Sequence, residues 1–386
     1  MGNRPNHPCS ALPVQPPTPT GENTRLPPLL SNRDSMEAAG AIGIPQRVQA
    51  LAEVGLSHLP PQYIQPPDLR PDPHRREAAD QGGVPVPVVD LDPSVDPLPR
   101  LHRACAKWGA FQVVNHGIPA RLLEEMKAAG LGFFRSPMET KLQYACDPGA
   151  AASEGYGSRM LAKDDGVLDW RDYFDHHTLP ESRRNPSRWP DFPHNYRDVV
   201  VEYSNNMKEL AQKLLRMISE SLGLPPSYVE ETVGEDYQNI TISYYSPCPQ
   251  PDLALGLQAH SDMGAITLLI QDDVGGLEVL QDGEWIPVQP LPGAIIVILA
   301  DQTEIISNGL FKSAIHRAVV NAHRARLSVA TFYDPSKTRR ISPAPQLVTK
   351  SCPLKYQEVL YGDYVSSWYS KGPEGKRNID GLLIHH

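Results

Sequence analysis

The chain has 386 residues, and half of its 40 prolines lie within residues 1–99. Hydrophobic residues make up 40% and charged residues 21%, as in globular proteins with one large core or two smaller ones. The net charge is −9 and lysine and arginine form no run, which argues against a nucleic-acid or membrane surface as partner. No apolar stretch reaches the length of a membrane-spanning helix, so we exclude a transmembrane helix.

The five cysteines are an odd number, widely spaced and without a CxxC pair. This pattern is typical of reduced thiols and not of a disulfide framework. The N-terminus lacks the charged-then-apolar layout of a secretory signal. We therefore predict a cytoplasmic protein, with the chloroplast as the alternative, because a transit peptide within residues 1–40 stays open.

The predicted elements begin after a proline-rich segment, residues 1–44, which we expect to be disordered. Apolar residues at helical spacing predict a short helix over 46–56, followed by a second proline-rich connector over 60–99. Alternating signals then predict strands over 84–91 and 110–115 and helices over 98–107, 120–134 and 202–222. Ser227 and Glu230 have the spacing of a capping box for one more short helix.

After Asp236 the hydrophobic period changes from 3.6 to 2, which predicts strands. Asp282-Gly283 between two of them is a two-residue hairpin signal. Eight short strands joined by Gly, Pro and Asp turns favour a mainly β fold with flanking helices, with a jelly-roll core and a helical N-terminal region. The predicted strands are residues 240–245, 253–260, 265–271, 276–280, 285–289, 294–299, 314–320 and 326–332.

Three residues in the strand-rich region have the chemistry of a metal site. His260 and Asp262 are two positions apart, so a strand directs both side chains to one face. His316, from a distant strand, completes two histidines and one carboxylate, which occupy one face of an octahedral Fe(II) and leave three positions open. An HxD motif is common by chance, and a lone histidine is more often a core residue, so the prediction depends on the residues around it.

A carboxylate-binding group follows ten residues later. Arg326 and Ser328 again share a strand face, and a guanidinium with a neighbouring hydroxyl suits a bidentate grip on a carboxylate. Tyr245 adds a phenol donor one strand before the metal candidates. Taken singly, each of these residues has an ordinary structural explanation. Their joint order and spacing favour one site.

Several motifs together resemble the plant Fe(II)/2-oxoglutarate-dependent dioxygenases, over about residues 45–380. Two of them are similar to the anthocyanidin-synthase and jasmonate-oxidase branches, namely Gly155-Tyr156-Gly157-Ser158 and Asp169-Trp170-Arg171-Asp172-Tyr173. The others are residues 108–117, Tyr244–Leu253, His260-Ser261-Asp262, residues 271–277, Ile306-Ser307-Asn308-Gly309, Lys312-Ser313 and His316-Arg317.

This resemblance implies a double-stranded β-helix that holds Fe(II) on His260, Asp262 and His316. It implies that 2-oxoglutarate binds through Arg326, Ser328 and Tyr245, and that O2 is consumed with release of succinate and CO2, with ascorbate in support. It divides the chain into an N-terminal region over 45–199, a catalytic jelly roll over 200–345 and a C-terminal helical segment over 346–386. A monomer is the expected state.

The sequence departs from the family where Ser243 stands in place of an asparagine that helps to orient the keto acid. Ser243 shares the strand face of Tyr245, so we keep it as a 2-oxoglutarate contact with shorter reach. Asp301, in a variant of another family motif, we interpret as structural and not as a ligand. The adjacent His176 and His177 we interpret as a solvated pair.

Strand parity and the resemblance together nominate a substrate pocket of Tyr156, Thr241, Phe332 and Asp334. A neutral Thr241 stands where several acid-oxidising relatives carry a basic residue, which disfavours a substrate carboxylate there. Tyr156 and Phe332 suit stacking on a planar ring. We therefore expect hydroxylation or desaturation of a small neutral aromatic, such as a flavonoid, a phenolic or a melatonin-like indole.

Three alternatives stay open at this point. A gibberellin- or jasmonate-type acid is the first, because Arg159 is placed to reach the pocket. An oxidase of the same fold that does not use 2-oxoglutarate is the second, and succinate release would separate it. A hormone-binding protein on a degenerate fold is the third, although the intact triad and the Arg326/Ser328 pair argue against it.

Overall fold

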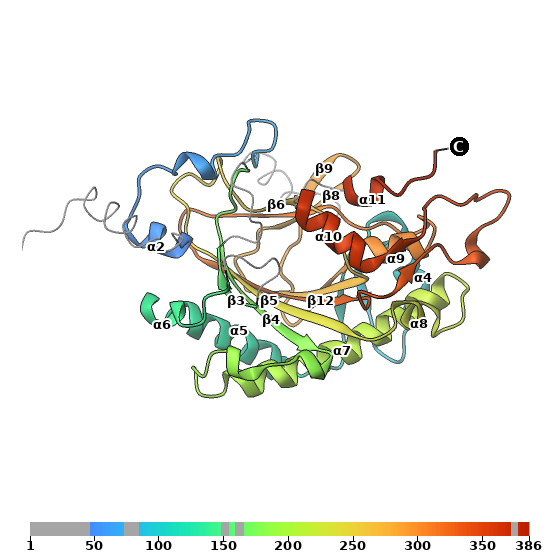
Figure 1. Ribbon diagram of the computed structural model, residues 1–386, viewed down its shortest axis with the longest axis horizontal. Helices are drawn as coiled ribbons and strands as arrows, with labels where there is room; N and C mark the ends of the chain where they lie inside the picture. Colours follow the sequence, from blue (N-terminus) through green and yellow to red (C-terminus); the bar gives the residue numbers. More distant parts are fainter. Residues whose placement is uncertain (1–46, 73–84, 148–153, 159–165, 372–376, 386) are drawn as a thin grey trace, which may run out of the picture. The chain divides into compact units, whose positions relative to one another are not determined.

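The computed structural model describes residues 47–72, 85–147, 154–158, 166–371 and 377–385 (Figure 1). The expected disordered segment, residues 1–44, lies outside the described residues, as does Arg159. Within the part that the structure describes, no helix is long and apolar enough to cross a membrane.

The larger sheet has eight strands in the order β1-β2-β10-β7-β12-β5-β4-β3. Two central strands, β7 (Ile266–Gln271) and β10 (Ile295–Leu299), are nearly continuous apolar or β-branched runs that are buried on both faces. These strands are β1 (Val88–Asp90), β2 (Ala110–Val114), β3 (Gly155–Gly157), β4 (Asp172–Leu179), β5 (Tyr237–Tyr245), β7 (Ile266–Gln271), β10 (Ile295–Leu299) and β12 (Arg326–Asp334).

The smaller sheet has four strands in the order β6-β11-β8-β9. Asp282 and Gly283 join β8 to β9 with φ of 50° and 85°, as a two-residue turn of the primed type requires. The strands are β6 (Leu255–His260), β8 (Leu277–Gln281), β9 (Glu284–Pro287) and β11 (His316–Val319), and a separate pair is formed by β13 (Arg340–Ile341) and β14 (Val359–Leu360). The eight strands expected after Asp236 are all present, and the β core with flanking helices confirms the predicted fold class.

Two long helices cover the outer face of the larger sheet. Figure 1 shows α5 (Ala120–Phe134) and α7 (Tyr196–Ser221) running beneath β4, β5 and β12. The remaining helices are α2 (Val48–Glu53), α4 (Leu98–Lys107), α6 (Met138–Leu142), α8 (Tyr228–Val233), α9 (Asp301–Ile306), α10 (Tyr361–Lys371) and α11 (Arg377–Asp380), with short 3-10 turns at Pro61–Tyr63, Glu181–Arg183, Pro186–Arg188 and Pro345–Leu347.

Side-chain parity in β4, β5 and β12 separates the core from the interior of the jelly roll. Phe174, Ile242 and Val329 are cross-strand neighbours, and all three pack into the main apolar core. Residues one position away, such as Thr241, point to the opposite face. This alternation places one set of polar side chains from three neighbouring strands inside the barrel, among them Thr241, Ser243, Arg326 and Ser328.

Two local expectations were wrong. Ser227 forms no side-chain capping bond, because its backbone is already helical (φ −82°, ψ −3°); the Val229 N–H instead donates to Ser219 Oγ of α7 at 3.1 Å. His176 is fully buried and not solvated, because its two ring nitrogens pair with the Ile240 carbonyl and the Tyr196 hydroxyl, each at 2.9 Å.

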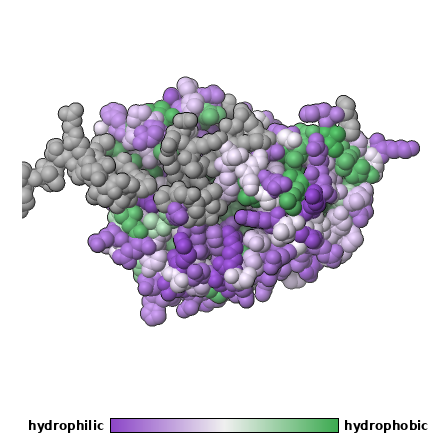
Figure 2. Space-filling view, viewed as in Figure 1, coloured by the Kyte–Doolittle hydropathy of each residue, from purple (hydrophilic) through white to green (hydrophobic). Residues whose placement is uncertain are grey.

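Where its residues are coloured, the face seen in Figure 2 is mainly hydrophilic. Figure 2 shows polar residues over most of the visible face, with hydrophobic residues in small groups. The most exposed large hydrophobic side chains of the described residues come from separate segments: Val54, Leu69, Val95, Leu291, Leu310 and Leu354. The structure therefore directs attention to the interior and not to an apolar docking surface.

Candidate active site

A cavity of about 410 Å³ lies between the two sheets. Its wall includes polar side chains from β4, β5, β6, β11 and β12, together with Trp368 and Tyr369 of α10. The cavity contains ten of the eleven residues that the sequence nominated as metal, 2-oxoglutarate or substrate contacts.

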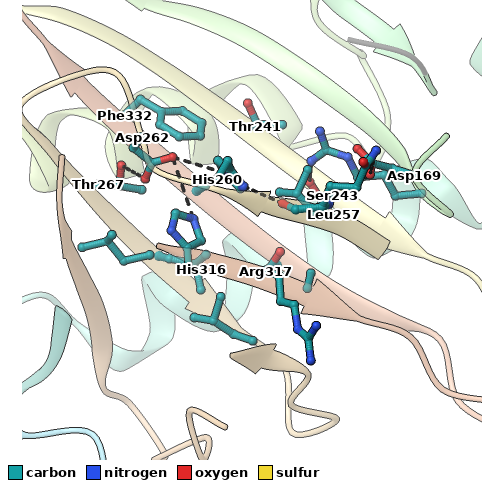
Figure 3. A pocket seen from close by; sticks show the side chains of 18 of the residues that line it. Asp169, Thr241, Ser243, Leu257, His260, Asp262, Thr267, His316, Arg317 and Phe332 are labelled. Atoms are coloured by element: carbon teal, nitrogen blue, oxygen red, sulfur yellow. Dashed lines mark hydrogen bonds and ion pairs between the residues drawn. The ribbon is translucent and has the colours of Figure 1, made fainter. Parts of the chain in front are cut away.

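His260, Asp262 and His316 meet in this cavity (Figure 3). His260 ends β6 and is the cross-strand partner of His316 at the start of β11. Asp262 Oδ1 lies 3.5 Å from His260 Nε2 and 3.8 Å from His316 Nε2. All three side chains are buried, and one ligand atom from each lies within 4.8 Å of the others.

Neighbouring groups fix the orientation of these three side chains. His260 Nδ1 lies 2.8 Å from the Gln258 carbonyl and His316 Nδ1 lies 3.1 Å from the Ala314 carbonyl. A carbonyl accepts only, so each Nδ1 carries the hydrogen and each Nε2 lone pair faces the centre. The Thr267 hydroxyl donates to Asp262 Oδ2 at 2.6 Å, which leaves Oδ1 toward the histidines.

The ionisation of the triad suits a divalent cation. Burial alone would raise the pKa of Asp262, but the neighbouring His316 and His260 imidazoles and the hydrogen bond from Thr267 lower that pKa to about 2. Burial lowers the pKa of His316 to about 4, and His260 beside it adds to this effect. An ionised carboxylate and imidazole nitrogens on one face form a donor set that fits Fe(II).

Four further nominated residues lie together on the wall of the cavity that β5 and β12 form, which we call its floor. Arg326 pairs across the strands with Tyr245, and Ser328 pairs with Ser243. The Arg326 guanidinium lies 4.7 Å from the centre of the Tyr245 ring and donates to Ser328 Oγ at 3.3 Å and Gln271 Oε1 at 3.0 Å. Its buried Nε has no hydrogen-bond partner among the described residues, so one strong donor there stays available to an anion.

A second arginine, which the sequence reasoning missed, reaches this group. Arg171 precedes β4, is buried, and donates from Nη1 to Ser243 Oγ at 3.2 Å. Burial would raise the pKa of Tyr245, but the charges of Arg326 and Arg171 outweigh it and lower that pKa. The end of the cavity at Tyr245 is therefore positively charged.

Three of the four nominated pocket residues, Thr241, Phe332 and Asp334, line the cavity. The structure does not bring Tyr156 there. In β3, Tyr156 pairs with Phe174 and so points to the helix side of the sheet, where its hydroxyl donates to Asp172 at 3.2 Å. The opposite face of β4 presents Asp175, which the sequence reasoning did not nominate because β4 itself was not predicted.

Two other residues in the region have structural roles. Asp301 is fully buried and accepts hydrogen bonds from Ser313 Oγ at 2.7 Å and the Tyr364 hydroxyl at 2.6 Å. Its N–H donates to the Asp262 carbonyl at 2.9 Å, but its side chain does not line the cavity. Arg317 follows His316, but Figure 3 shows its guanidinium pointing away from the triad. There it pairs with Glu278 at 2.7 Å and lies 4.2 Å from the Trp285 ring centre.

Comparison with known proteins gives concordant results over both halves of the chain. The sequence model of the 2OG-Fe(II) oxygenase superfamily matches residues 237–335, which span β5 to β12. A second model, the N-terminal region of the non-haem dioxygenases in morphine synthesis, matches residues 86–192.

Individual relatives match over most of their length. Jasmonate-induced oxygenase 4 of Arabidopsis thaliana is 38% identical, covering 87% of this chain and 96% of the relative. A flavonoid 7-O-demethylase of Ocimum basilicum is 36% identical, covering 88% and 91%. The crystal structure of JOX2 in complex with 2OG, Fe and JA superposes with a TM-score of 0.82 at 37% identity, covering 89% of this chain and 98% of that one.

Proposed function

Because the chain belongs to the 2OG-Fe(II) oxygenase superfamily, and is a 2-oxoglutarate-dependent dioxygenase of the plant type, we propose that its cavity oxidises a small aromatic metabolite. The observation that carries the proposal is the shared cavity. The triad of His260, Asp262 and His316 opens into the same space as the Arg326 guanidinium, so a metal and a dicarboxylate can bind side by side.

Each group of residues has a defined task in this proposal. His260, Asp262 and His316 hold Fe(II), which together with bound 2-oxoglutarate activates O2 for oxidation of the substrate, with succinate and CO2 as the other products. Arg326 and Ser328 hold the far carboxylate of 2-oxoglutarate, and Tyr245 and Ser243 complete its walls. Burial of these donors excludes competing water and strengthens their hold on the anion.

The substrate end favours a neutral aromatic compound, oxidised by hydroxylation or desaturation. Phe332 and Trp368 both line the cavity and offer faces for a planar ring. Thr241 brings no positive charge, and its hydroxyl is already donated to Asp175 at 2.6 Å. A flavonoid, a phenolic or an indole would satisfy this combination.

An acid substrate is the second candidate. It is supported by the similarity to JOX2, whose crystal contains JA, and by the jasmonate-induced oxygenases among the relatives. The two candidates differ in the charge that the substrate end of the cavity must present. An acid needs a cation at the end away from Arg326, whereas a neutral aromatic does not.

We expect the enzyme to act as a monomer, since every proposed ligand of the metal and of 2-oxoglutarate comes from one chain.

The test of the proposed function incubates the purified protein with Fe(II), 2-oxoglutarate, ascorbate and a plant metabolite extract. Succinate should form together with a product that has gained one oxygen or lost two hydrogens. His260→Ala and Asp262→Ala should remain folded and form neither, and turnover of the extract without succinate would contradict the proposal.

A further inference from the structure

The floor of the cavity carries basic side chains at one end and carboxyl side chains along the rest of its length. On β12, Arg326 and Asp334 face the same side and are eight residues apart, about 26 Å along an extended strand. Arg171 lies with Arg326 near Tyr245, at the end proposed for 2-oxoglutarate. Asp175 pairs with Thr241 of β5, and Thr241 pairs with Ala330 of β12, so Asp175 lies about halfway along the floor between Arg326 and Asp334.

The two carboxyl side chains, Asp175 and Asp334, belong to the buried wall of the cavity. Asp175 and Asp334 are both buried, at 8% and 9% exposure, and both line the cavity wall. Asp175 Oδ1 accepts the Thr241 hydroxyl, and no further hydrogen bond to this carboxylate forms among the described residues. Gly264 leaves the space that Asp334 fills, because a Cβ at Gly264 would lie 1.7 Å from Asp334 Oδ1.

Several groups face these carboxyls. Burial raises the pKa of the Tyr369 hydroxyl of α10, and the charges of Asp175 and Asp334 raise it further. Burial raises the pKa of both carboxyls; Asp262 further raises that of Asp334, whereas Arg183 and Tyr361 lower it. Arg183 and Arg171 lower the pKa of Asp175, and Glu154 raises it. Arg183 is not part of the cavity wall and donates to Asn239 Oδ1 at 2.9 Å.

We propose that Asp175 and Asp334 select a substrate whose non-reacting end carries a hydroxyl or an amine, and that they reject a carboxylate. A carboxyl oxygen that is buried and not fully paired gains most from an O–H or N–H donor. A second carboxylate placed beside it would be repelled and would also lose its hydration, and both effects weaken binding. This inference rests on the proposed function, because it assumes that 2-oxoglutarate occupies the end at Arg326.

The test uses four naphthalene probes that differ only at the end of one short arm and carry no donor on the ring. They are 2-(1-naphthyl)ethylamine, 2-(1-naphthyl)ethanol, its methyl ether and 1-naphthylacetate. Their affinities are measured by titration calorimetry with the anaerobic protein loaded with Fe(II) and 2-oxoglutarate. We expect the amine and the alcohol to bind at least tenfold more tightly than the ether and the acetate.

The double variant Asp175→Asn/Asp334→Asn separates the two kinds of donor. An asparagine oxygen still accepts a hydrogen bond but carries no charge. The amine should therefore lose at least tenfold in affinity, the alcohol should change little, and the acetate should gain. Asp282→Asn, at the exposed β8–β9 turn, is the matched control and should preserve the wild-type order.

The proposal is overturned if the acetate binds as tightly as the amine, if no probe binds at millimolar concentration, or if the double variant keeps the wild-type order. A fall of the melting temperature of the double variant by more than about 5 °C would likewise overturn it, by assigning the pair to stability. Failure of the proposed function has a different signature. The probes would then bind in the expected order while the enzyme releases no succinate with any metabolite.

Discussion

The Arg171 guanidinium donates a hydrogen bond to the Ser243 hydroxyl, with 3.2 Å between Nη1 and Oγ. The Ser243 side chain is short, so by itself it reaches less far into the cavity than the asparagine that the family resemblance leads us to expect there. Arg171 approaches the same point from the neighbouring strand and adds a positive charge there. The pair therefore offers a donor group for the keto acid that neither residue would offer alone.

Replacing Arg171 by leucine should weaken the binding of 2-oxoglutarate. A hydrogen bond to a charged group contributes about 1.5–3 kcal/mol, so KM for 2-oxoglutarate should rise roughly 10- to 100-fold while kcat falls less. Steady-state kinetics with varied 2-oxoglutarate measure both constants. Arg324→Leu is the control, because Arg324 is exposed and pairs with Asp273 outside this cavity. An unchanged KM in Arg171→Leu would show that Arg171 does not contribute to the binding of 2-oxoglutarate.

Thr267→Val should weaken the binding of iron without unfolding the protein. The Thr267 hydroxyl holds the second oxygen of Asp262, and loss of such a partner typically costs 10- to 100-fold in metal affinity. Anaerobic titration with Fe(II), or with Mn(II) as a stable substitute, measures the change. Thr232→Val, where the hydroxyl donates within α8, should leave the affinity unaltered. Equal affinities in wild type and Thr267→Val would show that the orientation of Asp262 is set elsewhere.

Asp172→Ala should destabilise the fold. This buried carboxylate accepts the N–H groups of Val48 and Gln49 at the start of α2 and the hydroxyls of Tyr156 and Ser158. Leaving such donors unpaired costs about 1–3 kcal/mol each before relaxation, so we expect a loss of roughly 3 kcal/mol in the free energy of unfolding. Chemical denaturation measures it. Asp273→Ala breaks an exposed pair and should cost less than about 1 kcal/mol; an equal loss in both would argue against the role of Asp172.

Stability should depend on pH through Asp334. Burial, together with repulsion by Asp262 and Asp175, raises its pKa to about 7 against the opposing effect of Arg183 and Tyr361. The unfolded value is about 3.9, so between roughly pH 4 and 7 the native state binds more protons than the unfolded state, and stability falls as the pH rises. Asp334→Asn removes this term. We therefore expect the melting temperature of metal-free Asp334→Asn, relative to that of the metal-free wild type, to rise from pH 5 to pH 8. A difference that stays constant over this range would contradict the prediction.

Much of the site follows from strand parity and could be predicted from the sequence. Thr241, Ser243 and Tyr245 alternate along β5, and Arg326, Ser328, Phe332 and Asp334 alternate along β12. The antiparallel register then brings both sets to one floor. Parity within a strand is a local property, so the residues of one face can be read without knowing the partner strand.

The remaining features depend on partners that local patterns do not specify. Tyr156 was assigned to the pocket, but the pairing of β3 with β4 turns it toward α5 and Asp172. Arg171 and Asp175 were missed because β4 lacks an alternating pattern: most of its polar side chains are buried on both faces. His176 is buried because Tyr196, from a helix 20 residues later, supplies its partner.

The most direct test of the account is binding of 2-oxoglutarate to the anaerobic protein in the presence and absence of Fe(II). Equilibrium dialysis with labelled 2-oxoglutarate should find one molecule per chain that depends on Fe(II). Arg326→Leu and His260→Ala should each weaken it at least tenfold, while Arg324→Leu should not. Binding that is independent of Fe(II), or that survives Arg326→Leu unchanged, would contradict the assignment of this cavity as the oxygenase site.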